Sequence, residues 1–495
     1  MANDELNLNE ILLLRRERLQ ELMDEGKNPF LIEKYDVKSK SSDIKDNFDE
    51  LEDTETSVAG RVMSKRGHGK ISFLDIQDSQ GRIQIFARKD ALEDSYEDVK
   101  KLDIGDIVGV KGTIFKTKAG EISVRASEII LLSKSLQILP EKFHGLKDID
   151  LRYRQRYVDL IVNPEIKEVF LTRNKIIKAI RKFLDERDYL EVETPILGTV
   201  AGGANARPFL THHNTLDLDM QLRIANELFL KRLIVGGFDK VYEMGKMFRN
   251  EGISTKHNPE FTNMELYAAY EDYEYIMNLT EDLFVYVAQE VLGTLELDYQ
   301  GTKLNLTQPW KRVSMQELVK EIVGVDFDEI NTDEEALEIA REKGLKPEAF
   351  WTRGHVISEL FEEFCESTLV QPTFVTGHPV EISPLSKRNP DDPRITNRFE
   401  LFMNTWELAN AFSELNDPID QRERFEAQMA DKESGDDEAH PMDYDFLNAI
   451  EVGLPPTGGL GIGVDRMIMI YTNQPSIRDI LFFPTMKPIG GSEEE

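Results

Sequence analysis

Two short stretches with β-strand patterns flank a polar segment. Residues 241–249 mix apolar residues with β-formers, and residues 261–267 alternate between polar and apolar residues. The segment between them, residues 251–260, is polar and contains glycine, asparagine and proline as breakers. Successive side chains of a strand point to opposite faces. The pattern therefore predicts two strands joined by a long loop, and the second strand has one face formed by Phe261, Asn263, Glu265 and Tyr267.

Periodicity also divides the rest of the chain into a β-rich part and a mixed part. Residues 58–132 contain five short β-rich runs between glycine-containing turns, with one helical insert, which favours an OB-fold barrel. Residues 5–25 are expected to form an amphipathic helix, and the polar, acidic residues 38–57 a linker. A helix and a strand closed by Pro195 are expected over 165–196. Further helices are expected over 223–237 and through most of 270–370.

A second informative stretch, residues 398–418, carries an unusual density of glutamates for a surface strand. Asn410, Phe412 and Glu414 share one face by period two, giving an amide, an apolar wall and a carboxylate. That set suits a long aliphatic side chain ending in an ammonium, because burying a cation without an acid is costly. Glu400 and Glu407 are candidates for Mg²⁺, which prefers oxygen ligands. Their positions differ in parity, so both face one ligand only if a bulge or strand end intervenes.

Glycines near the C-terminus and in the middle of the chain would let a ligand approach the backbone closely. Gly458, Gly459, Gly461 and Gly463 are expected between a turn and a helix, with Arg466 in the first turn of that helix. Residues 201–209 form a second glycine-rich turn, which alone is best explained as an ordinary hairpin turn. The first spacing matches neither a Walker loop nor a dinucleotide-binding fingerprint, so these glycines carry little weight alone.

Composition limits the possible classes of protein without choosing among them. The 495 residues exceed the size of one core, and no apolar run is long enough for a membrane span. The acidic N-terminus has no signal-peptide pattern, and a lone cysteine, Cys365, allows no disulfide within the chain; both favour the cytoplasm. The net charge of −32 opposes RNA binding if taken whole. Residues 58–89, however, hold seven Lys or Arg against two acids, a local net of +5.

The loop after the first predicted strand carries the strongest chemical signal. Arg249 and Glu251 lie at the strand end, and Lys256 and His257 lie in the loop, so the segment offers a fork for carboxylate or phosphate. A charged hairpin on a solvated sheet is the plain alternative. The wider string FRNEGIST-H-PEFT-ME-Y resembles motif 2 of the class II aminoacyl-tRNA synthetases, specifically the lysyl group with its aspartyl and asparaginyl relatives. Residues 165–196 resemble motif 1 and residues 453–484 resemble motif 3.

The resemblance implies an α+β fold with an OB-fold β-barrel for the anticodon and a class II catalytic domain on a mainly antiparallel sheet flanked by helices. The expected divisions are 1–57 for the N-terminal helix and linker, 58–140 for the barrel, 141–163 for an interdomain segment, 164–489 for the catalytic domain and 490–495 for a disordered tail.

It also implies roles for particular residues. Catalysis is assigned to Arg249 and Arg466, Mg²⁺ binding to Glu400 and Glu407, and anticodon binding to Arg61, Phe73 and Gln84. Phe73 alone could equally be barrel core. The ATP site is expected to include Arg249, Glu251, His257, Phe261, Glu407 and Arg466. The lysine site is expected to include Gly203, Glu227, Arg249, Glu265, Tyr267, Asn410, Phe412 and Glu414.

The implied activity is ATP-dependent ligation of lysine to tRNA(Lys) through a lysyl-adenylate, in an enzyme of the bacterial type. The implied partners are tRNA(Lys), lysine and ATP, with Mg²⁺, more than one ion per site, and a second copy of the chain as a homodimer. Three alternatives remain open at this point. They are an aspartyl or asparaginyl enzyme, a paralogue that lysylates a protein, and a non-catalytic RNA-binding protein on the same fold.

Overall fold

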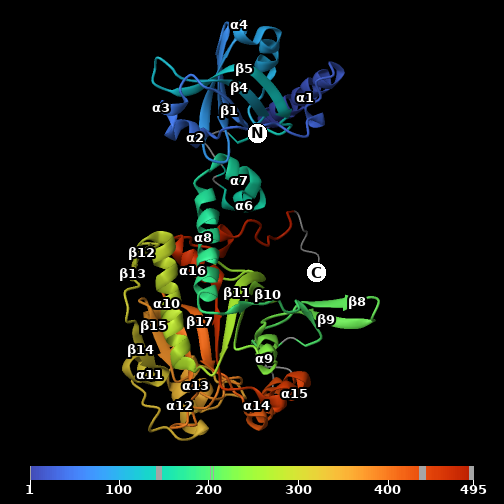
Figure 1. Ribbon diagram of the computed structural model, residues 1–495. Helices are drawn as coiled ribbons and strands as arrows, with labels where there is room; N and C mark the ends of the chain where they lie inside the picture. Colours follow the sequence, from blue (N-terminus) through green and yellow to red (C-terminus); the bar gives the residue numbers. More distant parts are fainter. Residues whose placement is uncertain are drawn as a thin grey trace. The chain divides into compact units, whose positions relative to one another are not determined.

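The computed structural model describes residues 2–140, 146, 148–200, 202–204, 206–433 and 442–489. The chain divides into two compact units, Met1–Lys147 and Asp148–Glu495 (Figure 1). The tail expected at 490–495 lies outside the described residues. Within them, no helix has the length and apolar character that crossing a lipid bilayer requires.

The first unit is a closed five-stranded barrel with helices packed on it. Its strands are β1 (Glu55–His68), β2 (Ile71–Gln77), β3 (Arg82–Arg88), β4 (Ile107–Lys116) and β5 (Ile122–Ser133), in the order β1-β2-β3-β5-β4. The helical insert predicted between β3 and β4 is present as α4 (Lys89–Leu92), η2 (Glu93–Ser95) and α5 (Tyr96–Lys101). Alternate residues of β2 and β3 are buried, so one side chain in two fills the barrel and its neighbour faces outward. The OB-fold barrel predicted from the sequence is confirmed.

The residues expected to form a linker instead cover part of the barrel. Residues 41–51 contain two short helices, α2 (Ser41–Asp46) and α3 (Phe48–Leu51). Ile44 and Phe48, four residues apart, are buried in the barrel core. Acidic residues dominate this segment, so the burial of its two apolar residues was not predicted from the sequence. Their burial depends on packing against the barrel.

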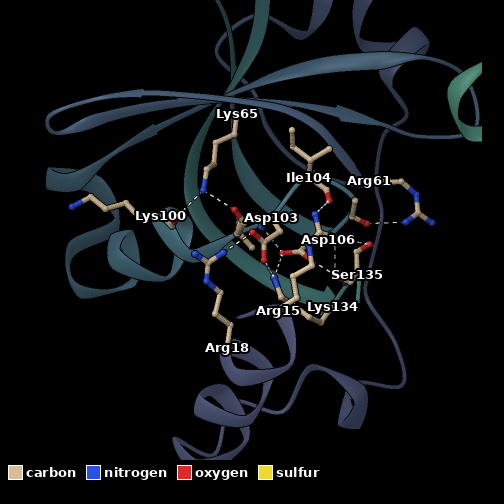
Figure 2. Close-up of polar contacts among 12 residues, drawn as sticks. Arg15, Arg18, Arg61, Lys65, Lys100, Asp103, Ile104, Asp106, Lys134 and Ser135 are labelled. Atoms are coloured by element: carbon tan, nitrogen blue, oxygen red, sulfur yellow. Dashed lines mark hydrogen bonds and ion pairs between the residues drawn. The ribbon is translucent and has the colours of Figure 1, made fainter. Parts of the chain in front are cut away.

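A buried ionic network ties the first helix, α1 (Ala2–Asp24), to the barrel (Figure 2). The ammonium of Lys134 lies 2.6 Å from Asp103 and 2.8 Å from Asp106, and its side chain is almost wholly buried. Arg18 of α1 pairs with Asp103 at 2.6 Å, and Arg15 donates to the carbonyls of Ile104 and Ser135, both at 3.0 Å. Buried charges are stable only when paired, so this network fixes where α1 docks.

The second unit is built on one eight-stranded sheet in the order β14-β15-β16-β17-β18-β11-β10-β6. The strands are β6 (Leu190–Glu191), β10 (Lys240–Phe248), β11 (Glu260–Ala269), β14 (Lys311–Ser314), β15 (Thr373–Thr376), β16 (Arg398–Met403), β17 (Trp406–Ser413) and β18 (Thr457–Ile462). All neighbours are antiparallel except β14 with β15 and β10 with β6. The predicted mainly antiparallel sheet is confirmed.

Helices cover this sheet and enclose its largest core. Helices α8 (Ile166–Asp185) and α10 (Tyr273–Leu292) pack together, and α16 (Val464–Tyr471) lies beside them (Figure 1). Met264, Leu266 and Ala268 of β11 point into this core. By the period of two, the odd-numbered residues of β11 point to the opposite face. There α9 (Glu227–Val235) and α15 (Tyr444–Gly453) form a second cluster with Tyr267.

Further elements complete the second unit. The short helices α6 (Ile149–Arg154) and α7 (Arg156–Val162) precede α8, and a three-stranded sheet is formed by β7 (Leu197–Gly198), β8 (Leu210–His213) and β9 (Leu218–Leu222). The region expected to be mostly helical includes α11 (Met315–Val323), α12 (Asp333–Glu342) and α13 (Arg353–Leu360), together with the hairpin β12 (Glu296–Tyr299) and β13 (Thr302–Asn305).

Two expectations about strands were wrong in detail. Residues 398–418 are a hairpin rather than one strand, because Asn404 and Thr405 both have positive φ and turn the chain between β16 and β17. The glycines at 458, 459 and 461 lie within β18 rather than in a loop before a helix. Glycine has low strand propensity, so the pattern suggested a loop; close approach of neighbouring side chains explains the glycines instead.

Candidate functional site

One cavity of about 450 Å³ brings together every residue that the sequence analysis assigned to lysine, ATP or Mg²⁺. Its walls come from β11, β17 and β18, from the loop between β10 and β11, and from the starts of α9 and α16. The predicted residues that line it are Gly203, Glu227, Arg249, Glu251, His257, Phe261, Glu265, Tyr267, Glu400, Glu407, Asn410, Phe412, Glu414 and Arg466. Their roles toward a ligand stay predictions.

One end of the cavity is lined by three buried glutamates. Glu227 begins α9, Glu265 lies on β11 and Glu414 follows β17, and each is at most 6 % exposed. The start of α9 is held in place by its N-cap residue Asn226, which donates to the buried Glu243 at 3.0 Å. This end therefore offers carboxylates and the rings of Tyr267 and Phe412, which suits an alkyl ammonium.

The three glutamates differ in their partners. Burial, reinforced by the nearby Glu227, raises the pKa of Glu265 to about 8. The hydroxyl of Tyr267 donates to Glu265 at 3.1 Å, and the amide of Asn263 approaches it at 3.3 Å. The raised pKa favours the protonated form of Glu265 at pH 7, whereas Glu227 and Glu414 both contact a cation of the protein, Lys231.

Two glycines are required where the backbone approaches this end. A Cβ on Gly459 would overlap the Glu414 carboxylate and lie 2.6 Å from the ring of Tyr267. Gly203 has φ of +89°, and a Cβ there would lie 3.1 Å from the Cβ of Glu227. Any side chain at either position would displace a residue of the cavity wall.

Another part of the cavity is cationic and aromatic. Arg249 follows β10, and its guanidinium carbon lies 5.2 Å from the centroid of the Phe261 ring. The Nε of Arg249 is buried and has no partner among the described residues. Unpaired buried donors are rare in native proteins, so this guanidinium is suited to an anionic ligand.

Arg466 is placed by the anchoring of α16. The neighbouring Asp465 accepts a hydrogen bond from the backbone of Thr262 at 2.8 Å and pairs with Arg173 at 2.6 Å, so the helix start is tied to β11 and α8. Arg466 donates to the backbone carbonyl of Glu407 at 2.7 Å. His257 lies 3.4 Å from Arg466, and burial followed by that positive charge lowers the pKa of His257. A neutral imidazole is therefore available beside the arginine.

Glu400 and Glu407 reach the same cavity from the two strands of one hairpin. They lie on β16 and β17, and Glu407 pairs with Phe402, two residues from Glu400 and on the same face of β16. The turn between the strands is therefore the strand end that reconciles their parity. Burial, followed by the charge of Glu400, raises the pKa of Glu407. Two carboxylates close enough to repel, in a cavity open to a ligand, fit Mg²⁺ held jointly with phosphates.

The barrel carries a separate candidate surface. Phe73 of β2 and Gln84 of β3 lie on the outward-facing side and are partly exposed, so Phe73 is not barrel core. The ring of Phe73 lies 5.1 Å from that of Phe86, which lies 5.6 Å from that of Phe115. Arg61 donates to the carbonyl of Gly105 at 2.8 Å (Figure 2). A row of partly exposed rings offers faces on which unpaired bases can stack.

Several residues that shape these sites were not predicted from the sequence. Phe86 and Phe115 extend the row of rings. Phe86 pairs with Phe73 across β2 and β3, and Phe115 lies on β4, so their closeness follows only from the pairing of strands in the barrel. Lys231 contacts both Glu227 and Glu414 from α9. Its spacing of four residues from Glu227 on a helix was a signal that could have found it.

Comparisons with known proteins agree with the two units. The description "tRNA synthetases class II (D, K and N)" matches residues 148–487, and "OB-fold nucleic acid binding domain" matches residues 56–132. A lysine–tRNA ligase of Thermoanaerobacter pseudethanolicus is 61 % identical over 487 residues, covering 98 % of each chain. A lysine–tRNA ligase of Halalkalibacterium halodurans is 57 % identical over 500 aligned residues, again covering 98 % of each.

A third relative, the lysine–tRNA ligase of Moorella thermoacetica, is 57 % identical over 481 residues, covering 97 % of this chain and 98 % of its own. The family description spans most of the chain, and the relatives match it from end to end. The chain therefore belongs to the class II tRNA synthetases of the D, K and N family.

Proposed function

We propose that this chain is a lysine–tRNA ligase, which joins L-lysine to the 3′ end of tRNA at the cost of ATP. The full-length identity to lysine–tRNA ligases supports the overall reaction. The observation that carries the amino-acid specificity is the acid-lined end of the cavity, where Glu227 and Glu414 are buried. An aspartyl or asparaginyl enzyme would need a cation or neutral donor there instead of two acids.

The reaction runs in two steps. The carboxylate of lysine attacks the α-phosphorus of ATP, a bond to the β-phosphate breaks, and pyrophosphate leaves. A ribose hydroxyl at the 3′ end of tRNA then attacks the carbonyl of the lysyl-adenylate, and AMP leaves. The substrate carboxylate is already a nucleophile, so the protein need only position the reactants and neutralise charge.

Each part of the cavity has a proposed role in the first step. Arg249 would bridge the lysine carboxylate and the α-phosphate, and Phe261 with Arg466 would enclose adenine. Glu251 and His257 would contact ATP, while Gly203, Asn410 and Phe412 would line the amino-acid site. Glu400 and Glu407 would hold Mg²⁺, which supplies positive charge to the phosphates.

The first test is ATP–pyrophosphate exchange measured without tRNA, with each proteinogenic amino acid in turn. Exchange with lysine alone is expected. Exchange with aspartate or asparagine would contradict the assignment of the acid-lined pocket. A lack of exchange with every amino acid would support the non-catalytic, RNA-binding alternative.

Phe73→Ala is expected to weaken tRNA charging while leaving adenylate formation unchanged. Stacking on an aromatic side chain contributes about 1–3 kcal/mol per base, so the KM for tRNA should rise roughly 5- to 150-fold. Aminoacylation and lysine-dependent exchange are measured on the same preparation. Phe30→Ala removes another exposed ring of the first unit and serves as the control. Loss of exchange in Phe73→Ala would mean that this ring supports the fold.

We also propose that two copies of the chain form a homodimer through the segment that resembles motif 1. Leu171 on α8, Leu190 on β6 and Ile196 after it are large apolar residues with 44–52 % exposure. Exposed apolar side chains grouped on one segment favour a protein interface. Leu171→Glu should shift sedimentation toward the monomer, whereas Ile322→Glu, at an exposed position on α11, should not. An unchanged dimer in Leu171→Glu would show that the interface lies elsewhere on the chain.

A cytoplasmic location stays a prediction from the sequence.

A further inference from the structure

A buried cation stands behind the acid-lined end of the cavity. Lys231 of α9 is 1 % exposed, and its ammonium contacts Glu227 at 2.5 Å and also pairs with Glu414. Glu227 and Glu414 line the cavity, whereas Lys231 is not among the described residues that do so. Lys231 therefore touches the two acids from the protein side and leaves their cavity side free.

The environment of Lys231 keeps it charged. Burial works against the ammonium, but the carboxylates of Glu227 and Glu414 outweigh burial and raise the pKa of Lys231. The rings of Phe412, Phe446 and Tyr267 surround it, with centroids 5.4, 5.7 and 6.0 Å from Nζ. Aromatic faces stabilise a cation that has been withdrawn from water.

The charges at this end then leave room for one more cation. Two carboxyl groups, those of Glu227 and Glu414, contact one ammonium, that of Lys231, while burial raises the pKa of Glu265 to about 8 and raises the pKa of Tyr267. Lys387, a further cation near Glu414, is partly exposed, so solvent screens it. With both carboxylates ionised, the three groups in contact would carry a net charge of −1, which one substrate ammonium neutralises.

We propose that Lys231 is a specificity-determining counter-ion, which holds Glu227 and Glu414 ionised and sets the pocket to accept a single ammonium group. The proposal rests on the proposed lysine ligase function and concerns the same site. Without Lys231, two adjacent buried carboxylates would share a proton, because like charges at short range cannot both ionise easily. Burial already raises the pKa of Glu414, and Lys231 is the group that opposes this rise.

The first test is Lys231→Met, which keeps the length of the side chain and removes its charge. At pH 7 the shared proton would leave lysine only one ionised carboxylate instead of two, so its KM should rise about tenfold at pH 7 and fall again toward pH 8 as the second carboxylate ionises. The wild-type KM, measured beside it, should lack this extra slope, and kcat should change far less than KM. The control Lys134→Met removes a lysine that is equally buried between two acids, in the first unit, and should leave the KM for lysine unchanged.

A second pair of variants tests the charge balance even if Lys231→Met folds poorly. Glu227→Gln leaves one acid paired with Lys231, so no net charge remains for the substrate, and the KM for lysine should rise strongly. Adding Lys231→Met to Glu227→Gln restores a net charge of −1. This double variant should bind lysine better than Glu227→Gln alone, which is the opposite of the effect of Lys231→Met in the wild type.

If Lys231 had a purely structural role, the double variant should bind lysine more weakly than Glu227→Gln alone, because it would combine the defects of the two single variants. The proposal is overturned if the double variant has a KM for lysine equal to or above that of Glu227→Gln, or if Lys231→Met shows no added pH dependence. Wild-type exchange with lysine, measured in the same series, tests the ligase function itself, so the two failures are distinguishable.

Discussion

Glu414→Gln should raise the KM for lysine so far that lysine activation is lost at ordinary lysine concentrations, while ATP binding stays intact. The carboxylate is 0 % exposed and lies at the end of the cavity, where it meets Lys231 on one side and the proposed substrate ammonium on the other. Removing one partner of a buried charge pair costs about 3–5 kcal/mol, because the other charge is left without a partner. The KM for lysine in ATP–pyrophosphate exchange should therefore rise by a factor of roughly 10² to 10⁴.

The control for this variant is Glu281→Gln. Glu281 is also buried, at 4 % exposed, but it accepts a hydrogen bond from the backbone of Trp310 and does not line the cavity. Its replacement should lower the melting temperature without changing the KM for lysine. ATP binding, followed by calorimetry, shows whether Glu414→Gln keeps the rest of the site. If exchange by Glu414→Gln depends on lysine concentration as exchange by the wild type does, the pocket assignment is contradicted.

Arg249→Lys should lower kcat for lysine activation by roughly 10²- to 10³-fold. A guanidinium can donate to two anions at once, whereas an ammonium is a point charge without that geometry. Losing one donor aimed at charge that develops in a transition state typically costs factors of this size. The buried Nε of Arg249, which has no hydrogen-bond partner among the described residues, supports such a role.

Arg181→Lys is the matched control, since Arg181 pairs with Glu191 at the surface of the second unit and lies outside the cavity. Single-turnover measurement of adenylate formation separates the chemical step from lysine binding. The role of Arg249 in the chemical step is rejected if Arg249→Lys forms adenylate at the wild-type rate.

Local patterns predicted the parts of the site that lie on single strands. The alternation over Phe261, Glu265 and Tyr267 placed these side chains on one face, and all of them line the cavity. The alternation over Asn410, Phe412 and Glu414 did the same on β17. Period two is a property of the strand itself, so it can be recognised without knowing the neighbouring strands.

Features that depend on pairing between distant strands escaped the sequence analysis. The sequence left open how Glu400 and Glu407, at an even and an odd position, could face one ligand, because the turn at Asn404 and Thr405 was not recognised. The glycine Gly459 was assigned to a loop because its neighbours, Glu414 and Tyr267, come from other strands. Lys231 lies in the helix expected over 223–237 and was given no role, since its second carboxylate, Glu414, lies far along the chain. In each case tertiary packing, rather than local propensity, decides the residue's role.

The position of β18 in the sheet has a consequence for how the chain is synthesised. Strands β11 and β17 carry the two walls of the lysine pocket, and β18 lies between them although it comes last in the sequence. A nascent chain on the ribosome thus exposes two unpaired strand edges until residues 457–462 emerge. Unpaired edges invite aggregation, and domains fold from the N-terminus during translation. The barrel can therefore be complete before the catalytic sheet closes, and a chain truncated before β18 is expected to aggregate rather than to act as a weakened enzyme.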